Sequence, residues 1–200
     1  MILSSAIDRG LGPPSREGTT KPFFLGVLTT LVALLAGAYV LLRSGTIPVN
    51  ADSKPLPLEI WAAHTALRAA VRRDSPKGPD PVPATPGHLM RGLRLYTTHC
   101  TICHGTVRGN AAAPPLARGE YPRPPQFASH GVERGRPGAI FWKIAHGIRW
   151  TGMPSWKRTL TDHEIWTLAL FLKHMDRLPP PVARAWRHVK VAPWPLPSHP

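Results

Sequence analysis

The sequence is poor in cysteine and in acidic residues, and both shortages limit what the chain can be. Its 200 residues include two cysteines, Cys100 and Cys103, which are too few for a disulfide-stapled secreted domain. There are 11 acidic against 25 basic residues, giving a formal net charge of +14. Three of the basic residues precede Arg43, so nearly all of this charge belongs to the rest of the chain and favours acidic partners. The basic residues are scattered and no nucleic-acid motif accompanies them, so nucleic acid is not an expected partner.

The chain also lacks any run of alternating polar and apolar residues, the pattern typical of β-strands. The sequence therefore predicts an all-α fold. Its 25 prolines crowd into Ile47–Pro86, Pro114–Pro125 and 179–200, so packed structure has to fit between these stretches. Helical patterns cover Leu58–Arg73, His88–Cys100, Ala139–Ile148 and Thr161–Asp176. In the last of these, Thr161 and Glu164 form a capping-box signal, and Pro179–Pro181 is expected to end the helix.

One long hydrophobic run is present, Phe23–Leu42. Its 20 residues carry no charge, and as a helix they would span about 30 Å, the thickness of a bilayer core. A cleavable signal peptide is the alternative, because Ala36-Gly37-Ala38 resembles a cleavage site. The apolar run continues to Leu42, past that site, and this favours an uncleaved membrane anchor.

Cys100-Thr101-Ile102-Cys103-His104 is C-x-x-C-H, the pattern of covalent haem attachment. Two thiols one helical turn apart can each add to a vinyl group on one edge of a porphyrin. The histidine that follows can then bind the iron. The sequence therefore predicts one haem c, held by Cys100 and Cys103, with His104 as an axial ligand.

Three other interpretations fit this motif less well. A thioredoxin-like dithiol needs a strand before the motif, whereas a helical pattern precedes it here. A zinc site needs four ligands, and none of the ten histidines shows metal-ligand spacing with the cysteine pair. A disulfide across two intervening residues would be strained and would leave His104 unexplained.

Met153 is the best candidate for the second axial ligand. It lies between Gly152 and Pro154 in a loop, 49 residues after His104, rather than on a helix face where a methionine is usually core filler. The weaker candidates are Met90, Met175, His130 and His146.

These features give a domain plan. It consists of a short cytoplasmic lead at 1–22, a transmembrane anchor at 23–42, a Pro-rich linker at 43–86 with a helix at 58–73, a haem domain at 87–178 and a Pro-rich tail at 179–200. Haem is attached outside the cytoplasmic membrane in bacteria. The haem domain is therefore expected on the periplasmic side of the inner membrane.

From about Gly87 to Leu178 the chain resembles the class I c-type cytochromes, the mitochondrial-cytochrome-c-like fold. The resemblance rests on Gly92, Tyr96 and Cys100 at four-residue intervals, on C-x-x-C-H, on the later Gly-Met-Pro loop, and on a final helix with Leu168 and Phe171. It implies that the first and last helices cross where Gly92 meets Phe171, with Tyr96 and Trp166 nearby. It also implies a proline carbonyl that accepts a hydrogen bond from the ligand histidine, and Pro114 matches that position.

The resemblance implies single-electron transfer, because a His/Met haem leaves no open site for a substrate. Respiratory-chain or other redox proteins with acidic docking faces are the expected partners, and Arg149, Lys157 and Arg158 beside the Met loop are the expected docking charges. One alternative is a fixed haem subunit of a respiratory, photosynthetic or dehydrogenase complex. Another is a haem sensor or enzyme with an open iron site.

Overall fold

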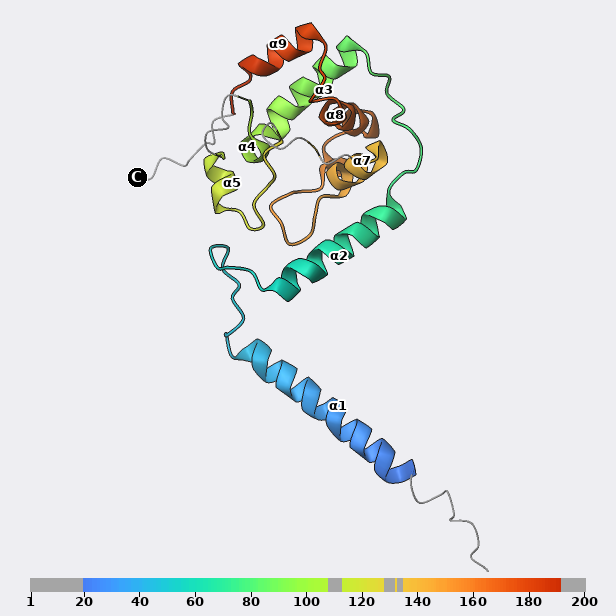
Figure 1. Cartoon of the computed structure of the whole chain (residues 1–200), viewed down its shortest axis with the longest axis vertical. Coiled ribbons are helices and arrows are strands. Elements are labelled where there is room, and N and C mark those ends of the chain that lie inside the picture. The colour runs from blue at the N-terminus through green and yellow to red at the C-terminus, as the bar shows by residue number, and fades with distance from the viewer. Residues whose placement is uncertain (1–19, 108–112, 128–131, 133–134, 192–200) are drawn as a thin grey trace, which may run out of the picture. The chain divides into compact units, whose positions relative to one another are not determined.

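The computed structural model describes residues 20–107, 113–127, 132 and 135–191, and the chain divides into two units, Met1–Val49 and Asn50–Pro200 (Figure 1). Every regular element in these described residues is a helix, which confirms the all-α fold class. Most of the expected lead, His130 and the end of the expected tail with Trp194 lie outside the described residues.

The first unit contains α1 (Thr20–Arg43), which encloses the expected span Phe23–Leu42. Within the described part of the chain, α1 is the one helix long and apolar enough to cross a membrane. It has 24 residues, a mean hydropathy of 2.3 over its best window and no buried side chain. A signal sequence near an N-terminus meets the same criteria of length and composition, so these two properties do not distinguish a membrane anchor from a signal segment.

The core of the second unit forms where α3 (Pro86–His99) crosses α8 (Asp162–Lys173). The two helices meet at Gly92, where a Cβ atom would lie 2.5 Å from the Thr167 carbonyl oxygen and 2.6 Å from Phe171 Cβ. A glycine is required for this close approach, as the resemblance to class I cytochromes implies. One turn later Tyr96 is fully buried, with its ring centroid 5.6 Å from that of Phe171.

Two further elements close the core around α8. α7 (Pro137–His146) packs along it, and Phe141 stacks on Trp166 with ring centroids 4.3 Å apart. The short 3-10 helix η2 (Trp156–Arg158) leads into the capping box of α8. There Thr161 Oγ1 accepts from the Glu164 backbone nitrogen at 3.3 Å, and a Glu164 carboxylate oxygen accepts from the Thr161 nitrogen at 3.0 Å. The sequence predicted this cap.

The chain after α8 differs from the expected Pro-rich tail. Residues Pro180–His188 form a helix, α9, which lies alongside α3 (Figure 1). Val182 and Trp186 are buried in the same core as α3 and α8. Proline is compatible with the first turn of a helix, where its missing N–H would have no partner, so the proline run begins α9 as well as following α8.

The expected linker before the haem domain is also packed in part. α2 (Pro57–Asp74) matches the predicted helix and contacts α7, with Val71 buried. Pro76 then lies against Gly138, which leaves no room there for a Cβ atom. Val82 is 4% exposed and joins the core. The packed unit therefore reaches beyond the expected limits of 87 and 178 at both ends.

Candidate haem site

The C-x-x-C-H motif lies at the end of α3. Cys100 ends that helix, and α4 (Thr101–His104) follows as a single turn. The Tyr96 hydroxyl lies 3.0 Å from the Gly105 carbonyl oxygen and 3.2 Å from that of His104, so the buried tyrosine fixes this turn to α3. One helical turn therefore separates the two thiols, as the motif predicts.

Both cysteines are free and half-buried. Burial raises the pKa of the Cys100 thiol to about 12, with a smaller contribution from Cys103. Burial also raises the pKa of the Cys103 thiol to about 12, together with the Glu120 carboxylate, whose oxygen lies 3.3 Å from Cys103 Sγ. Both sulfurs are therefore neutral thiols near neutral pH.

His104 is held by a backbone carbonyl and by an aromatic ring. Its Nδ1 atom lies 2.9 Å from the Pro125 carbonyl oxygen. Because a carbonyl can only accept, Nδ1 carries the hydrogen, and Nε2 keeps its lone pair for a metal. The ring stacks on Phe127 with centroids 4.3 Å apart and an interplanar angle of 11°. Burial is the main influence on the imidazole and lowers its pKa, which favours the neutral form that binds metals.

Pro114, the expected acceptor for His104, does not contact it. The Pro114 carbonyl oxygen accepts instead from the Arg118 nitrogen at 3.1 Å, because Pro114 precedes the first residue of α5 (Pro115–Gly119). Pro125 takes the expected position, and this corrects the assignment made from the sequence. Another Pro-Pro pair, Pro124-Pro125, follows Pro114-Pro115 in the chain and was the available signal.

The motif opens into a cavity of about 610 Å³, a volume typical of cofactor pockets, which range from about 300 to 1,000 Å³. Cys100, Cys103 and His104 lie on its wall, and so does Met153 from the loop after α7. The rest of the lining is mainly apolar and includes Phe127, Ile140, Ile144, Ile148, Leu168 and Leu172. Segments distant in the sequence thus place both cysteines, an imidazole and a thioether around one apolar space.

The loop that carries Met153 is fixed at several points. The Met153 carbonyl oxygen accepts from the Ile148 nitrogen at 3.2 Å, and the Met153 nitrogen donates to Thr151 Oγ1 at 3.1 Å. Just beyond, the Ser155 hydroxyl donates to the Ala145 carbonyl oxygen at 2.7 Å. Gly147 ends α7 with φ of 66°, and a Cβ atom on it would lie 2.6 Å from the Met153 carbonyl oxygen. The loop therefore folds back tightly over the end of α7.

The other candidate axial ligands are placed elsewhere. Met90, Met175 and His146 do not line the cavity, and His146 is exposed. His130 lies outside the described residues. His99, which sequence reasoning did not consider, borders the cavity with its ring 4.9 Å from that of Trp156. Among the candidates that the structure describes, Met153 is the one that faces the cavity.

Glu120 is a second residue that sequence reasoning missed. Its carboxylate borders the cavity and contacts the Cys103 thiol, and a Cβ atom on Gly152 would lie 2.6 Å from its carboxyl carbon. It thereby lies between the cysteine motif and the Met153 loop. A lone acidic residue in a Pro-rich loop carries no local sequence signal for this position.

These residues fit a covalently attached haem. The two thiols have the required spacing, the His104 imidazole offers Nε2, and the cavity is large and apolar enough for a porphyrin. The described residues contain no group of three or more His, Cys, Asp and Glu that could hold a metal ion, so a four-ligand zinc centre of such residues has no support among them.

Comparisons with known proteins agree with this fit. The family described as "Cytochrome C oxidase, cbb3-type, subunit III" matches residues 87–172. No curated protein matches the chain. Among solved structures, a chain of the reducing HAO-like protein complex of Kuenenia stuttgartiensis is 25% identical over 48% of this chain and 48% of that chain, with a TM-score of 0.38. The chain spans about half of that relative's length. A TM-score this low is no basis for assigning a fold or a function.

The family match covers α3, the cysteine motif, α7 and almost all of α8, which are the elements that enclose the cavity. The match over residues 87–172 is consistent with a class I c-type cytochrome domain, and such a domain implies haem c as the cofactor.

Proposed function

We propose that the protein is a membrane-tethered monohaem cytochrome that passes single electrons between redox partners on the outer face of the cytoplasmic membrane. Cys100 and Cys103 hold the haem through thioether bonds, and His104 and Met153 are the axial iron ligands. One observation carries the proposal: His104 and Met153 line the same cavity as both cysteines, although Met153 comes from a separate segment.

The protein's own groups favour electron transfer over substrate chemistry. When bound, haem c supplies a one-electron iron couple. The Pro125 carbonyl oxygen orients His104, and the Met153 loop is held by its own hydrogen bonds, so both ligands are positioned before the electron arrives. The lining of the cavity is mainly apolar, as suits a porphyrin. With His104 and Met153 as iron ligands, the haem would offer no open coordination site to a substrate.

The surface beside the Met153 loop supports docking to acidic partners. Arg149, Lys157 and Arg158 are exposed there, and Trp150 is 90% exposed between them. Long-range attraction by such cations speeds encounter at low ionic strength and weakens as salt screens it. Electron transfer to an acidic partner should slow with added salt, whereas stable co-purification with a complex would indicate a fixed subunit.

The tether is α1, retained as an anchor. The 24-residue apolar helix supports this location, and the haem attachment motif supports a position of the following unit outside the cytoplasm. The alternative, cleavage after Ala38, predicts a mature protein that lacks α1 and is released from membranes. The N-terminal sequence of the mature protein and its extraction at alkaline pH distinguish the two.

The decisive experiment compares absorption spectra of the wild type, Met153→Ala and Met175→Ala. Met175 is the matched control, since it is half-buried near the end of α8 but does not line the cavity. We expect a c-type spectrum in all three and loss of the weak long-wavelength Met–iron band in Met153→Ala alone. Carbon monoxide should bind the reduced Met153→Ala protein and not the wild type.

Three outcomes would contradict the proposal. An unchanged Met–iron band in Met153→Ala would remove Met153 as the ligand, and binding of carbon monoxide to the reduced wild type would favour a sensor or enzyme. Absence of covalent haem from a chain expressed with a haem-maturation system would overturn the roles of Cys100 and Cys103.

A further inference from the structure

One face of α2 packs within the second unit and the other is uncovered. On the packed face Val71 is buried, and Leu67 and Ala70 are half-buried. The opposite face carries a stripe at helical spacing, Leu58, Trp61, Ala62, Thr65 and Ala69, in which every residue is exposed. This set is called the α2 stripe below.

Exposed apolar side chains are concentrated at the N-terminal end of α2. In the described part of the second unit, six large apolar side chains are exposed, and four of them lie between Leu56 and Trp61. Leu58 is 71% exposed and Trp61 is 62% exposed. Isolated exposed side chains are ordinary, but a cluster of this kind marks a surface that something covers.

The charges around the stripe are arranged for an anionic surface. Arg68 and Arg72 flank it, and it contains no carboxylate. Glu59 lies off the stripe beside the Tyr121 hydroxyl. Asp74 is paired with Arg73, 2.7 Å from its Nε atom.

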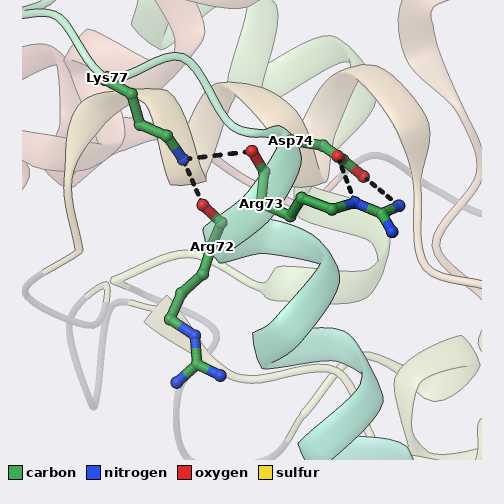
Figure 2. Close-up of polar contacts among 4 residues, drawn as sticks. All are labelled: Arg72, Arg73, Asp74 and Lys77. Atoms are coloured by element: carbon green, nitrogen blue, oxygen red, sulfur yellow. Dashed lines mark hydrogen bonds and ion pairs between the residues drawn. The ribbon is translucent and has the colours of Figure 1, made fainter.

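Arg72, at the C-terminal end of α2, does not take part in the ion pair between Arg73 and Asp74. Figure 2 shows Arg73 directed to Asp74, while the Arg72 side chain points away from both. The Lys77 ammonium donates to the carbonyl oxygens of Arg72 and Arg73 and closes the end of the helix. The Arg72 guanidinium therefore adds to the positive edge of the stripe.

The linker between α1 and α2 is short enough for α2 to contact the bilayer that α1 would span. Residues 44–56 join α1 to α2, and a chain of that length extends at most about 45 Å. Tryptophan is enriched at membrane–water interfaces, where its ring contacts the acyl chains and its N–H faces the headgroups. A stripe of leucine, tryptophan and alanine with flanking arginines has the composition of a helix that lies in this interface.

We propose that the α2 stripe rests in the headgroup region of the bilayer that α1 spans. Leu58 and Trp61 then insert among the upper acyl chains, and Arg68 and Arg72 meet anionic headgroups. The inference rests on the membrane anchor of the proposed function. Its consequence is that the haem domain is held at the membrane surface instead of swinging freely on its linker.

The test uses the full haem-loaded chain in nanodiscs of phosphatidylcholine and phosphatidylglycerol. A benzophenone amino acid is placed at Ala62, or as a control at Arg184, which is exposed on α9. After illumination, mass spectrometry of the peptides should find lipid adducts at position 62 and not at 184. The double variant Leu58→Ser with Trp61→Ser should reduce the adducts severalfold, whereas Trp150→Ser, which removes another exposed tryptophan, should not.

The possible failures are distinguishable. Release of the wild-type chain from membranes by alkaline carbonate would refute the anchor, and the proposed tether with it. A chain that stays in the nanodisc but gives no lipid adduct at position 62 would overturn this inference alone. A protein adduct at position 62 in intact cells, without a lipid adduct in nanodiscs, would also overturn it and would assign the stripe to a protein partner.

Discussion

At Gly147 the backbone has φ of 66°, and the carbonyl oxygen of Met153 lies where a Cβ atom would need space, 2.6 Å away. The backbone angles of Gly147, φ of 66° and ψ of −171°, are adopted almost only by glycine, so alanine there would cost about 1–3 kcal/mol and would also push the loop outward. We expect Gly147→Ala to keep covalent haem but to weaken or lose the Met–iron band and to lower the reduction potential. Absorption spectra and a redox titration measure both.

Gly119→Ala is the matched control for this change, because a Cβ atom there meets nothing within 4 Å. Its spectrum and potential should equal those of the wild type. A normal Met–iron band in Gly147→Ala would mean that the loop tolerates displacement and that Gly147 does not set the position of Met153.

Gly92 gives a second prediction, for stability. In an open helix Gly→Ala gains about 1 kcal/mol, but here the new methyl group would overlap Thr167 and Phe171. Overpacking of this kind costs about 1–3 kcal/mol, so Gly92→Ala should lower the free energy of unfolding. Guanidinium titration measures it. Gly87→Ala in the same helix would meet only Thr85 Oγ1 at 3.9 Å and should not destabilise the protein. If both variants lowered the free energy of unfolding equally, the close helix crossing would not be the cause.

Single residues differ in how far the sequence can predict them. Cys100, Cys103 and His104 are singled out by a local spacing, and the structure places all three on the wall of one cavity. The acceptor for His104 is a tertiary contact across 21 residues, and a proline motif could not decide between Pro114 and Pro125. Glu120 is also positioned by a loop path that no periodic pattern encodes.

Among the helices, α8 has the clearest N-terminus, and its cap should make stability depend on pH. Hydrogen bonds from Thr161 to the Glu164 carboxylate, with Arg91 nearby, lower the pKa of Glu164 in the folded state. A carboxylate with a lowered folded pKa stabilises the protein above its unfolded pKa, and this stabilisation is lost as pH falls through the folded value.

Glu164→Gln should therefore be less stable than the wild type at neutral pH, and the difference should shrink as the pH falls below the ordinary glutamate value of 4.5. Guanidinium titrations at pH 7 and in acid measure it. Asp162→Asn changes an acidic residue of the same turn outside the capping box and is the control. A difference that stays constant with pH would exclude the Glu164 charge as its source.

α9 was not predicted, although its signal is present in the sequence. Val182, Ala185, Trp186 and Val189 recur at helical spacing, but the prolines before them were interpreted only as a stop for α8. Proline at the first positions of a helix is favourable, so the same residues end one helix and begin the next. The sequence alone could not show that this short helix would be buried.

Trp186 should be the largest single contribution of α9 to stability. Its ring lies 5.5 Å from that of Tyr96 and 5.8 Å from that of Phe171, edge to face in both cases. Truncation of a buried tryptophan costs about 3–5 kcal/mol, so Trp186→Ala should lower the unfolding temperature markedly. Arg187→Ala, at an exposed position of the same helix, is the control. Equal melting temperatures for the two variants would show that α9 does not stabilise the core.

At the scale of the whole chain, composition predicted the order of the segments better than their packing. The apolar run and the C-x-x-C-H motif lie where α1 and the cytochrome domain are found. The Pro-rich stretches were expected to be linkers, yet Pro76 and Val82 pack into the second unit. Proline excludes regular helix and sheet, but it does not exclude burial, so composition does not show which residues of a Pro-rich stretch pack against the core.

The cavity between the cysteine motif, α7, α8 and the Met153 loop implies that the cofactor completes the core of the second unit. Without haem, the apolar side chains that line its 610 Å³ would face water, and this would remove much of the hydrophobic stabilisation of a domain whose whole stability is ordinarily about 5–15 kcal/mol. The double variant Cys100→Ala with Cys103→Ala, which cannot attach haem, should therefore lose most helical circular dichroism from α3, α7 and α8. Met153→Ala keeps both thioether bonds and His104, so it should stay folded. Cooperative unfolding of the haem-free double variant at a temperature near that of the wild type would show that the helices close the core without the cofactor.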